Sequence, residues 1–258
     1  TMIKAVFFDI DGTLVSFKTH RVPESTVKAI AALRDRGVRV FVASGRHLLS
    51  INNLGDLQFD GYITLNGGYC MVGERVVYKH SIPPEDISSV VRYMEQTEEF
   101  PCIFVHEHAL YMNYTNELTK DVFRMLNFPE PPCVSLREAA KGEIFQLVAF
   151  FTREQEGAIM SVMPCSEATR WNPLFTDVIP RGSSKQVGVD KIIEYFGIPL
   201  EETMAFGDGG NDIPMLRHVG IGVAMGNAEN DVKQVADYVT ASVDEDGIEK
   251  ALRHFGVI

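Results

Sequence analysis

The sequence has few cysteines and none of the spacings that bind zinc or build a disulfide framework. Its four cysteines are Cys70, Cys102, Cys133 and Cys165, and each is separated from the next by about thirty residues. Cysteines this far apart are typical of reduced, mostly buried side chains that behave as small apolar groups. Neither a structural zinc site nor a disulfide-stapled fold is therefore indicated.

Long hydrophobic runs are also missing. No stretch approaches the roughly 20 apolar residues that a membrane-spanning helix requires. The one early apolar run, residues 3–8, is short and is followed by Asp9, which does not fit a secretory signal. We therefore expect a cytoplasmic protein with no membrane partner.

Positive charge is scarce, because 24 Lys and Arg stand against 35 Asp and Glu, a formal net charge of −11. Nucleic acids and anionic membrane surfaces are bound by basic patches, so neither is expected as a partner. A small phosphorylated metabolite is compatible with this composition, since a local cluster of cations and a metal can outweigh the net charge. We expect the chain to act on such a metabolite as a monomer or a weak dimer.

Apolar runs that indicate buried strands alternate with amphipathic helices at both ends of the chain. Residues 3–8 and 38–43 show almost no polar alternation, which is typical of parallel strands covered on both faces. Between them, residues 24–36 have apolar positions at helical spacing. The alternation predicts an α/β core with a doubly wound, mostly parallel, Rossmann-like sheet, formed by residues 1–81 and 182–258.

Residues 82–181 interrupt this alternation. They begin with Pro83-Pro84 after Ile82, and their short strands and helices lack the strand–helix rhythm of the flanking segments. A proline-rich turn, residues 129–132, divides them. The change predicts an inserted α+β domain that forms a cap on the core.

Two carboxylates, Asp9 and Asp11, follow the strand 3–8 and precede Gly12-Thr13. Burying an isolated carboxylate is costly unless a cation, a metal or hydrogen bonds compensate for the charge. In an open α/β sheet, ligands bind at the carboxyl ends of the strands, where a divalent metal and a phosphate would satisfy both acids. Aspartate can also attack phosphorus to give an aspartyl-phosphate. From these residues alone, an Asp-Gly turn after an edge strand remains the alternative.

Two further polar segments stand where a helix is expected to begin. Ser44-Gly45-Arg46 follows the strand 38–43, and its hydroxyl and backbone amides suit either a phosphate or a helix cap. Lys185 enters a helix at the end where the helix dipole disfavours a cation. It therefore requires a nearby anion, unless it is a solvated surface lysine.

A loop rich in glycine and acids, residues 207–212 (Gly-Asp-Gly-Gly-Asn-Asp), follows the apolar strand 203–206. Its glycines permit a tight turn, and its carboxylates and amide supply the hard oxygen ligands that suit Mg²⁺. An ordinary Gly/Asn/Asp loop is the alternative, but the place of this loop at the carboxyl end of a strand favours a metal site.

Taken in order, four segments resemble the motifs of the haloacid dehalogenase-like phosphohydrolases: Asp9-Ile10-Asp11-Gly12-Thr13, Ser44-Gly45-Arg46, Lys185 and residues 207–212. Residues 66–68, 223–228 and 244–247 resemble the Cof-type branch of sugar-phosphate phosphatases. The resemblance covers the chain from end to end and includes the cap. Two positions depart from the usual pattern: Ser44 stands where threonine is common and keeps the hydroxyl, and Gln186 stands where glycine is common.

The resemblance implies a mechanism. Asp9 is the nucleophile, and Asp11 protonates the leaving oxygen and then acts as the base on the water that cleaves the aspartyl-phosphate. Asp11 is accordingly expected to carry a proton, or to share one, when the reaction starts. Mg²⁺ is expected on the carboxylates of Asp9 and Asp208 and the backbone carbonyl of Asp11, with Asp212 behind them. The residues expected to bind phosphate or substrate are Ser44, Gly45, Arg46, Asn66, Gly67, Lys185 and Asn211.

The expected function is hydrolysis of small phosphate monoesters such as hexose and pentose phosphates. A phosphosugar mutase is a second candidate, since it differs only in whether water or a sugar hydroxyl receives the phosphoryl group. A non-catalytic phosphosugar-binding regulator is a third, disfavoured by the acids at positions 9, 11 and 208.

Selectivity is expected to come from the cap, because the core motifs contact only phosphate and metal. Its polar strand residues Asp177, Tyr114, Arg170 and Asn172 suit a hydroxylated ligand. Asp177 suits hydrogen bonds from sugar hydroxyls, although a solvated acid at a strand end fits the sequence equally well.

Overall fold

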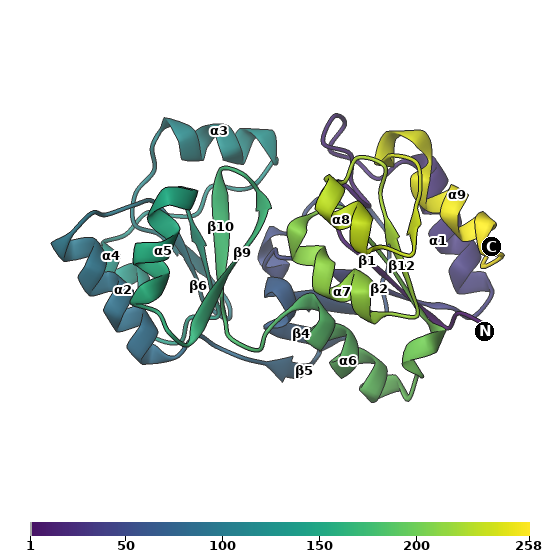
Figure 1. Cartoon of the computed structure of the whole chain (residues 1–258), viewed down its shortest axis with the longest axis horizontal. Helices are drawn as coiled ribbons and strands as arrows, with labels where there is room; N and C mark the ends of the chain where they lie inside the picture. The colour runs from purple at the N-terminus through teal and green to yellow at the C-terminus, as the bar shows by residue number, and fades with distance from the viewer. Residues whose placement is uncertain (1) are drawn as a thin grey trace. The chain divides into compact units, whose positions relative to one another are not determined.

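The structure, a computed structural model, describes residues 2–258 and divides them into two compact units (Figure 1). The core unit runs to Lys79 and resumes at Ser184, and the insert unit comprises His80–Ser183. The sequence placed these boundaries after residue 81 and before residue 182. Each unit has its own sheet and its own hydrophobic core.

The core unit contains an eight-stranded sheet. In spatial order its strands are β13 (Tyr238–Val239), β12 (Ile221–Ala224), β11 (Thr203–Gly207), β1 (Ala5–Phe8), β2 (Arg39–Ala43), β3 (Gly61–Thr64), β4 (Tyr69–Val72) and β5 (Arg75–Lys79). The strands from β13 to β3 are parallel, and β4 and β5 continue the sheet in antiparallel pairing.

Helices cover both faces of this sheet. They are α1 (Glu24–Asp35), α6 (Lys185–Phe196), α7 (Ile213–His218), α8 (Asn230–Val235) and α9 (Gly247–His254). Successive side chains of a strand point to opposite faces, so Val6 and Phe8 pack with α1 and α9, whereas Ala5 and Phe7 pack with α6, α7 and α8. The predicted α/β class with a doubly wound, mostly parallel sheet is confirmed.

The arrangement of β1 gathers three loops at one edge of the sheet. β1 lies between β11 and β2, and its last residue, Phe8, is paired with Phe206 on one side and Val42 on the other. The loops that follow these strands therefore begin side by side. This carboxyl edge of a parallel sheet is where α/β folds bind ligands.

The insert unit contains a five-stranded antiparallel sheet. Its strands, in spatial order, are β7 (Leu110–Met112), β6 (Cys102–Val105), β8 (Gln146–Ala149), β10 (Phe175–Pro180) and β9 (Ser166–Asn172). Its helices are α2 (Pro84–Gln96), α3 (Glu117–Met125), α4 (Leu136–Ala139) and α5 (Arg153–Ser161). Val90 of α2 and Ile159 of α5 pack in the core of this unit. The sequence did not predict α4, because a single turn is too short to show helical periodicity.

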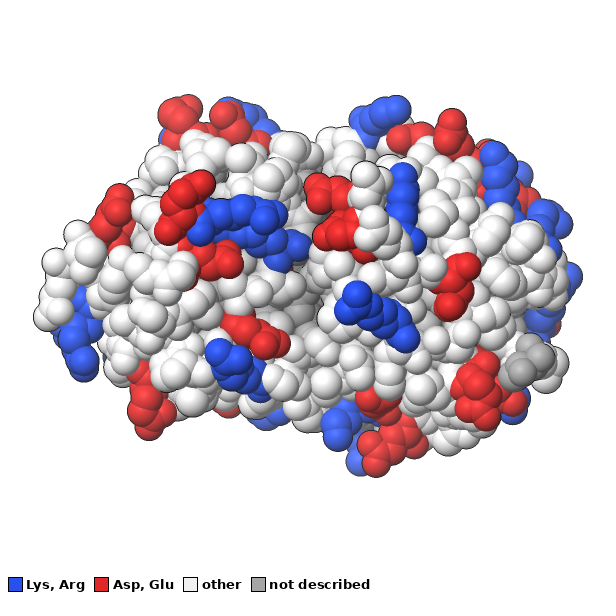
Figure 2. All heavy atoms as spheres, viewed as in Figure 1, with Lys and Arg blue, Asp and Glu red and all other residues white. Residues whose placement is uncertain are grey.

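The surface carries charges of both signs. Figure 2 shows acidic and basic side chains interspersed over the face in view, with uncharged surface between them. No continuous basic patch covers the described residues on this face. Within residues 2–258, no helix is both long enough and apolar enough to cross a bilayer.

Candidate active site

The chain turns sharply after β1. The amide of Leu14 donates to the carbonyl of Asp9, which closes the turn. Gly12 adopts a φ of +83°, in the left-handed region that glycine enters without strain. A Cβ atom built on Gly12 would lie 2.1 Å from Asp208 Oδ2. The turn therefore brings its backbone directly against the loop that follows β11.

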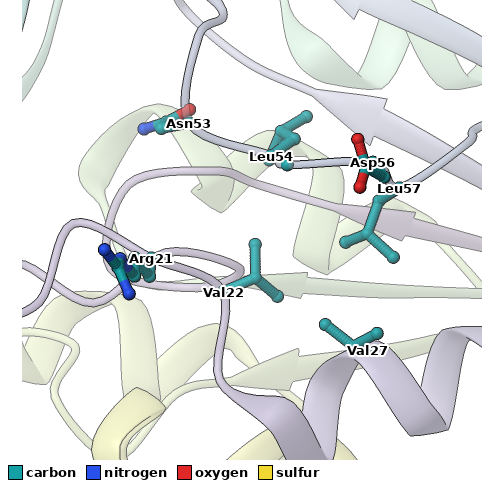
Figure 3. A pocket seen from close by; sticks show the side chains of 8 residues that line it. Arg21, Val22, Val27, Asn53, Leu54, Asp56 and Leu57 are labelled. Carbon is teal, nitrogen blue, oxygen red and sulfur yellow. The ribbon is translucent and has the colours of Figure 1, made fainter.

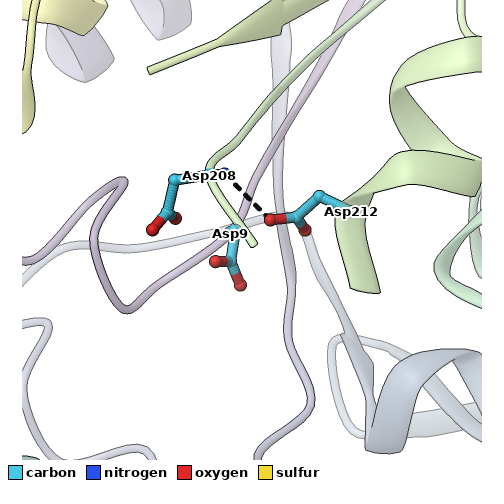
Figure 4. Close-up of side chains that lie close together, drawn as sticks. All are labelled: Asp9, Asp208 and Asp212. Carbon is cyan, nitrogen blue, oxygen red and sulfur yellow. Dashed lines mark hydrogen bonds between the residues drawn. The ribbon is translucent and has the colours of Figure 1, made fainter. Parts of the chain in front are cut away.

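Three carboxylates meet beside this turn. Asp9, Asp208 and Asp212 each offer one oxygen, and these atoms lie within 4.8 Å of one another (Figure 4). Thr13 Oγ1 donates to Asp208 Oδ1 at 2.8 Å. Asp212 Oδ2 accepts the backbone amides of Asp208 and Gly209, both at 2.9 Å. These hydrogen bonds hold Asp208 and Asp212 in place.

Lys185 is the cation of this cluster. It is the first residue of α6 and has no exposed surface. Its Nζ lies 2.7 Å from Asp9 Oδ1 and 2.6 Å from Asp212 Oδ1. Burial alone would lower the pKa of Lys185, but the charges of Asp212 and Asp9 outweigh burial and raise the pKa overall. The alternative of a solvated surface lysine is therefore wrong.

If all three carboxyl groups of the cluster were ionised, their negative charge would exceed the positive charge of Lys185. Burial, reinforced by the charge of Asp212, raises the pKa of Asp9 to about 7 in spite of Lys185. Burial also raises the pKa of Asp208 well above its usual value, and the charge of Asp9 adds to this. A divalent cation would offset the excess charge, and carboxylate oxygens are ligands that Mg²⁺ prefers. The residues present therefore fit the metal that the sequence predicts.

Asp11 lies outside this group of three carboxylates and is bound by Arg46. Its Oδ2 accepts from Arg46 Nε at 2.7 Å, and its Oδ1 accepts from Arg46 Nη2 at 2.8 Å. Both side chains are nearly buried, with 2% of Arg46 and 9% of Asp11 exposed. A guanidinium that contacts both oxygens of a carboxylate fixes its orientation. The pair therefore holds Asp11 apart from the three clustered acids.

Ser44 is buried at the end of β2, and its Oγ accepts the amide of Arg46 at 3.0 Å. The helix expected at this point is absent, and a single 3₁₀ turn, Leu48–Ser50, follows instead. The physical reason is that the carbonyls of Ser44 and Arg46 accept the amides of Asn66 and Leu65 from another loop. These carbonyls therefore have partners outside a helix.

The loop after β3 passes through three residues in the left-handed region, Leu65, Asn66 and Gly67, with φ values of 51°, 54° and 93°. A Cβ atom on Gly67 would lie 1.9 Å from the Ser184 carbonyl oxygen, so only glycine fits there. Asn66 Oδ1 accepts from Asn211 Nδ2 at 2.9 Å. Asn211 is 6% exposed, and its Oδ1 has no hydrogen-bond partner among the described residues. A buried, unpartnered amide oxygen indicates a place for a ligand that donates a hydrogen bond.

Two supporting contacts were missed by reasoning from the sequence. Thr13 holds Asp208, as described above. Asn227 Nδ2 donates to the carbonyl of Gly12 at 2.9 Å, and its Oδ1 accepts the amide of Val243 at 2.9 Å. Asn227 thus ties the turn after β1 to the loop before α9. Both residues lie in segments that resemble family motifs, and that resemblance is the one feature of the sequence that points to a role for them.

The predicted selectivity residue Asp177 belongs to the insert unit. It lies on β10 and is only 2% exposed, so the alternative of a solvated acid is wrong. Its Oδ2 accepts from Trp171 Nε1 at 3.3 Å. Arg170 bonds within the same unit to Glu156 Oε1 and to the carbonyl of Phe151.

A separate hollow of about 490 Å³ lies in the core unit (Figure 3). It is lined by Arg21, Val22, Val27, Asn53, Leu54, Gly55, Asp56 and Leu57. Figure 3 shows Arg21 and Asp56 on opposite sides of the apolar side chains. None of the predicted site residues lines it, so the candidate active site is the acidic cluster at the carboxyl edge of the sheet.

A sequence model of the haloacid dehalogenase-like hydrolases matches residues 6–252. The chain belongs to this family. YkrA of Bacillus subtilis (strain 168) is 37% identical over 257 residues, which cover 99% of this chain and 98% of YkrA. The 5-amino-6-(5-phospho-D-ribitylamino)uracil phosphatase YcsE of the same organism is 30% identical over 255 residues, which cover 98% of this chain and 96% of YcsE.

Solved structures of the family show the same fold. The sugar phosphatase BT4131, of subclass IIB of the haloacid dehalogenase superfamily, has a TM-score of 0.95 at 52% identity, with 99% of this chain and all of that one covered. The family predicted from the sequence motifs is therefore confirmed. The expectation of a phosphoric monoester hydrolase is supported by these relatives.

Proposed function

We propose that this family member is a Mg²⁺-dependent phosphatase that hydrolyses small phosphate monoesters, chiefly hexose and pentose phosphates, through an aspartyl-phosphate on Asp9. One observation carries the proposal. Asp9 is buried at the carboxyl edge of β1 beside two further carboxylates, and Lys185 is the one ammonium they share among the described residues. Buried carboxylates in excess lower stability, so a purely structural role does not account for them.

Asp9 suits nucleophilic attack on phosphorus. Its bond to Lys185 orients the carboxylate. Attack forms a bond between an Asp9 oxygen and phosphorus and breaks the P–O ester bond, and the leaving alkoxide oxygen takes a proton to give the alcohol. Water then cleaves the aspartyl-phosphate, which regenerates Asp9 and gives inorganic phosphate. Asp11 is assigned the proton transfer in both steps.

The carboxylates of Asp9 and Asp208 would hold Mg²⁺, which when bound neutralises charge on the phosphoryl oxygens. Asp212 accepts hydrogen bonds from the Asp208 amide and from Lys185, so it fixes the position of Asp208 relative to Lys185. The Asn211 side-chain oxygen suits a hydroxyl or water donor, because an acceptor cannot bind an anionic phosphate oxygen.

Sugar phosphates are proposed as substrates for two reasons. BT4131, at 52% identity, is a sugar phosphatase. The insert unit also carries Asp177 on β10, where its carboxylate accepts a hydrogen bond from Trp171, and we propose that the same carboxylate accepts hydrogen bonds from sugar hydroxyls. A few such bonds, about 1–3 kcal/mol each, give broad rather than strict selectivity among sugar phosphates.

A phosphate-release screen over many phosphorylated metabolites tests the proposal. We expect turnover of hexose and pentose phosphates with Mg²⁺, and none after chelation or in Asp9→Asn. An isomeric hexose phosphate as the main product would instead indicate a mutase. Tight binding without turnover at saturating Mg²⁺ would indicate a regulator, and a strong preference for nucleotides or phosphopeptides would contradict the sugar assignment.

A further inference from the structure

The guanidinium of Arg46 is fixed by directed hydrogen bonds to Asp11 and Ser50. Nε and Nη2 donate to the two carboxylate oxygens of Asp11 at 2.7 and 2.8 Å. Nη1 donates to the carbonyl of Ser50 at 2.9 Å. A planar guanidinium that meets both oxygens of one carboxylate constrains the orientation of that carboxylate more than any single contact would.

The backbone on both sides of this pair is fixed as well. The amide of Arg46 donates to Ser44 Oγ, and its carbonyl accepts the amide of Leu65. On the other side, Asp11 forms a β-bridge with Val15 within the turn after β1. The pair therefore joins the loop after β1 to the loop after β2, and Asp11 is held by an anchored partner.

This geometry gives Arg46 a role different from phosphate binding. One edge of the guanidinium that can make two parallel hydrogen bonds, Nε and Nη2, is directed at Asp11, and Nη1 at its other end donates to the carbonyl of Ser50. We propose that Arg46 is a positioning residue, which fixes the carboxylate of Asp11 for proton transfer and does not bind the substrate phosphate. This inference rests on the proposed phosphatase function.

The role predicts a dependence on the leaving group. An alkyl phosphate requires a proton on its leaving oxygen, whereas p-nitrophenyl phosphate releases a stable phenolate and requires none. In single-turnover experiments, Arg46→Ala is expected to slow cleavage of an alkyl phosphate by about 10–100-fold and cleavage of p-nitrophenyl phosphate by less than about threefold. A merely structural role would slow both cleavages equally.

Two further measurements separate positioning from binding. Arg46→Ala combined with Asp11→Asn is expected to be no slower than Asp11→Asn alone, because Arg46 acts through Asp11. The inhibition constant of inorganic phosphate is expected to change by less than about threefold in Arg46→Ala. Added guanidinium ion is expected to restore alkyl phosphate cleavage to Arg46→Ala and not to the double variant.

Arg36→Ala is the matched control, because Arg36 donates to the Val257 carbonyl at an exposed site and its loss should change none of these values. Equal losses with both esters, additive losses in the double variant, or a rise of about tenfold or more in the inhibition constant of phosphate would overturn the proposal.

If Arg46→Ala does not fold, the same measurements are made on Arg46→Lys, which keeps the charge but loses the paired contact with Asp11. If the wild-type protein cleaves neither ester, the proposed function is wrong. If the wild-type protein is active and the variants keep its ratio of alkyl phosphate to p-nitrophenyl phosphate cleavage rates, only the proposed role of Arg46 is wrong.

Discussion

Lys185 and Asp212 form an ion pair in which neither side chain has exposed surface, with Lys185 Nζ 2.6 Å from Asp212 Oδ1. The same ammonium lies 2.7 Å from Asp9 Oδ1, so one cation stabilises two buried carboxylates. Lys185→Met is expected to lower the free energy of unfolding by about 3–5 kcal/mol, because it leaves both carboxylates without this cation. Urea denaturation in the presence of a chelator measures this change.

Lys28→Met is the control for that experiment. Lys28 pairs with Glu24 on the exposed surface of α1, and an exposed pair of this kind contributes little to stability. Its loss should leave the urea midpoint unchanged. A Lys185→Met protein as stable as Lys28→Met would show that the buried ion pair does not hold the cluster together.

Asp9→Asn should separate activity from stability. Phosphate release is expected to fall by at least about 10³-fold, because the amide is a poor nucleophile. The chelated protein should not lose stability near neutral pH, because burial already raises the pKa of Asp9 to about 7 and so disfavours its charge. Activity and thermal unfolding of one preparation give both values. Retained turnover in a folded variant would remove Asp9 as the nucleophile.

The sequence located Asp9, Lys185 and Asp208 within the fold because hydrophobic periodicity identifies the strands and the helix at whose ends they stand. It could not show that Arg46 bonds to Asp11, since the two are 35 positions apart. A motif names residue types, but the acceptor that a flexible arginine reaches depends on how the loops pack. The same limit applies to Asn227, which lies in the family-like segment 223–228 but whose contacts with the distant residues Gly12 and Val243 depend on the packing of loops.

The helix expected after Ser44-Gly45-Arg46 failed for a related reason. A serine before an apolar segment favours a helix start, but the competing partners come from the distant residues Leu65 and Asn66. These two non-glycine residues have positive φ values of 51° and 54°, a conformation that propensities do not predict. Tertiary hydrogen bonds override the local preference here.

Mg²⁺ should stabilise the protein more at about pH 8 than at about pH 5.5. The pKa of Asp9 is raised from 3.8 to about 7 in the folded state. The folded protein therefore binds this proton more tightly than the unfolded chain, and stability falls as pH rises between the two values. Mg²⁺ binds the ionised carboxylates, so it offsets this loss at high pH and competes with protons at low pH.

Thermal unfolding with and without Mg²⁺ at the two pH values tests this expectation. At about 100 times the dissociation constant a ligand stabilises by about 2.7 kcal/mol, which corresponds to a rise of roughly 5–10 °C in Tm at the higher pH. Asp208→Asn should abolish most of the rise, because it removes a proposed ligand. An equal rise at both pH values would contradict a site made of carboxylates with raised pKa values.

Asp177→Ala should change substrate selectivity. Loss of hydrogen bonds to sugar hydroxyls, about 1–3 kcal/mol, is expected to lower kcat/KM for the best hexose phosphate by about 5–100-fold. Turnover of p-nitrophenyl phosphate, which has no sugar hydroxyls, should be unchanged and reports that the variant is folded. If kcat/KM for the hexose phosphate stays the same, Asp177 has no part in specificity.

Gly12→Ala should weaken metal binding through the backbone alone. Its Cβ would stand 2.1 Å from Asp208 Oδ2, at a φ of +83°, so the Asp208 carboxylate must move. A displacement of about 1 Å near reacting groups can cost about 10²-fold in rate, and we expect a loss of similar size in kcat with a higher Mg²⁺ requirement.

Gly37→Ala is the matched control, because Gly37 has a φ of +75° and a Cβ there would meet no described atom within 4 Å. Gly37→Ala should show the backbone strain as a lower Tm with Mg²⁺ affinity unchanged. Equal Mg²⁺ affinity in the two variants, measured by the Tm shift on titration, would contradict contact between the Gly12 turn and the metal ligand.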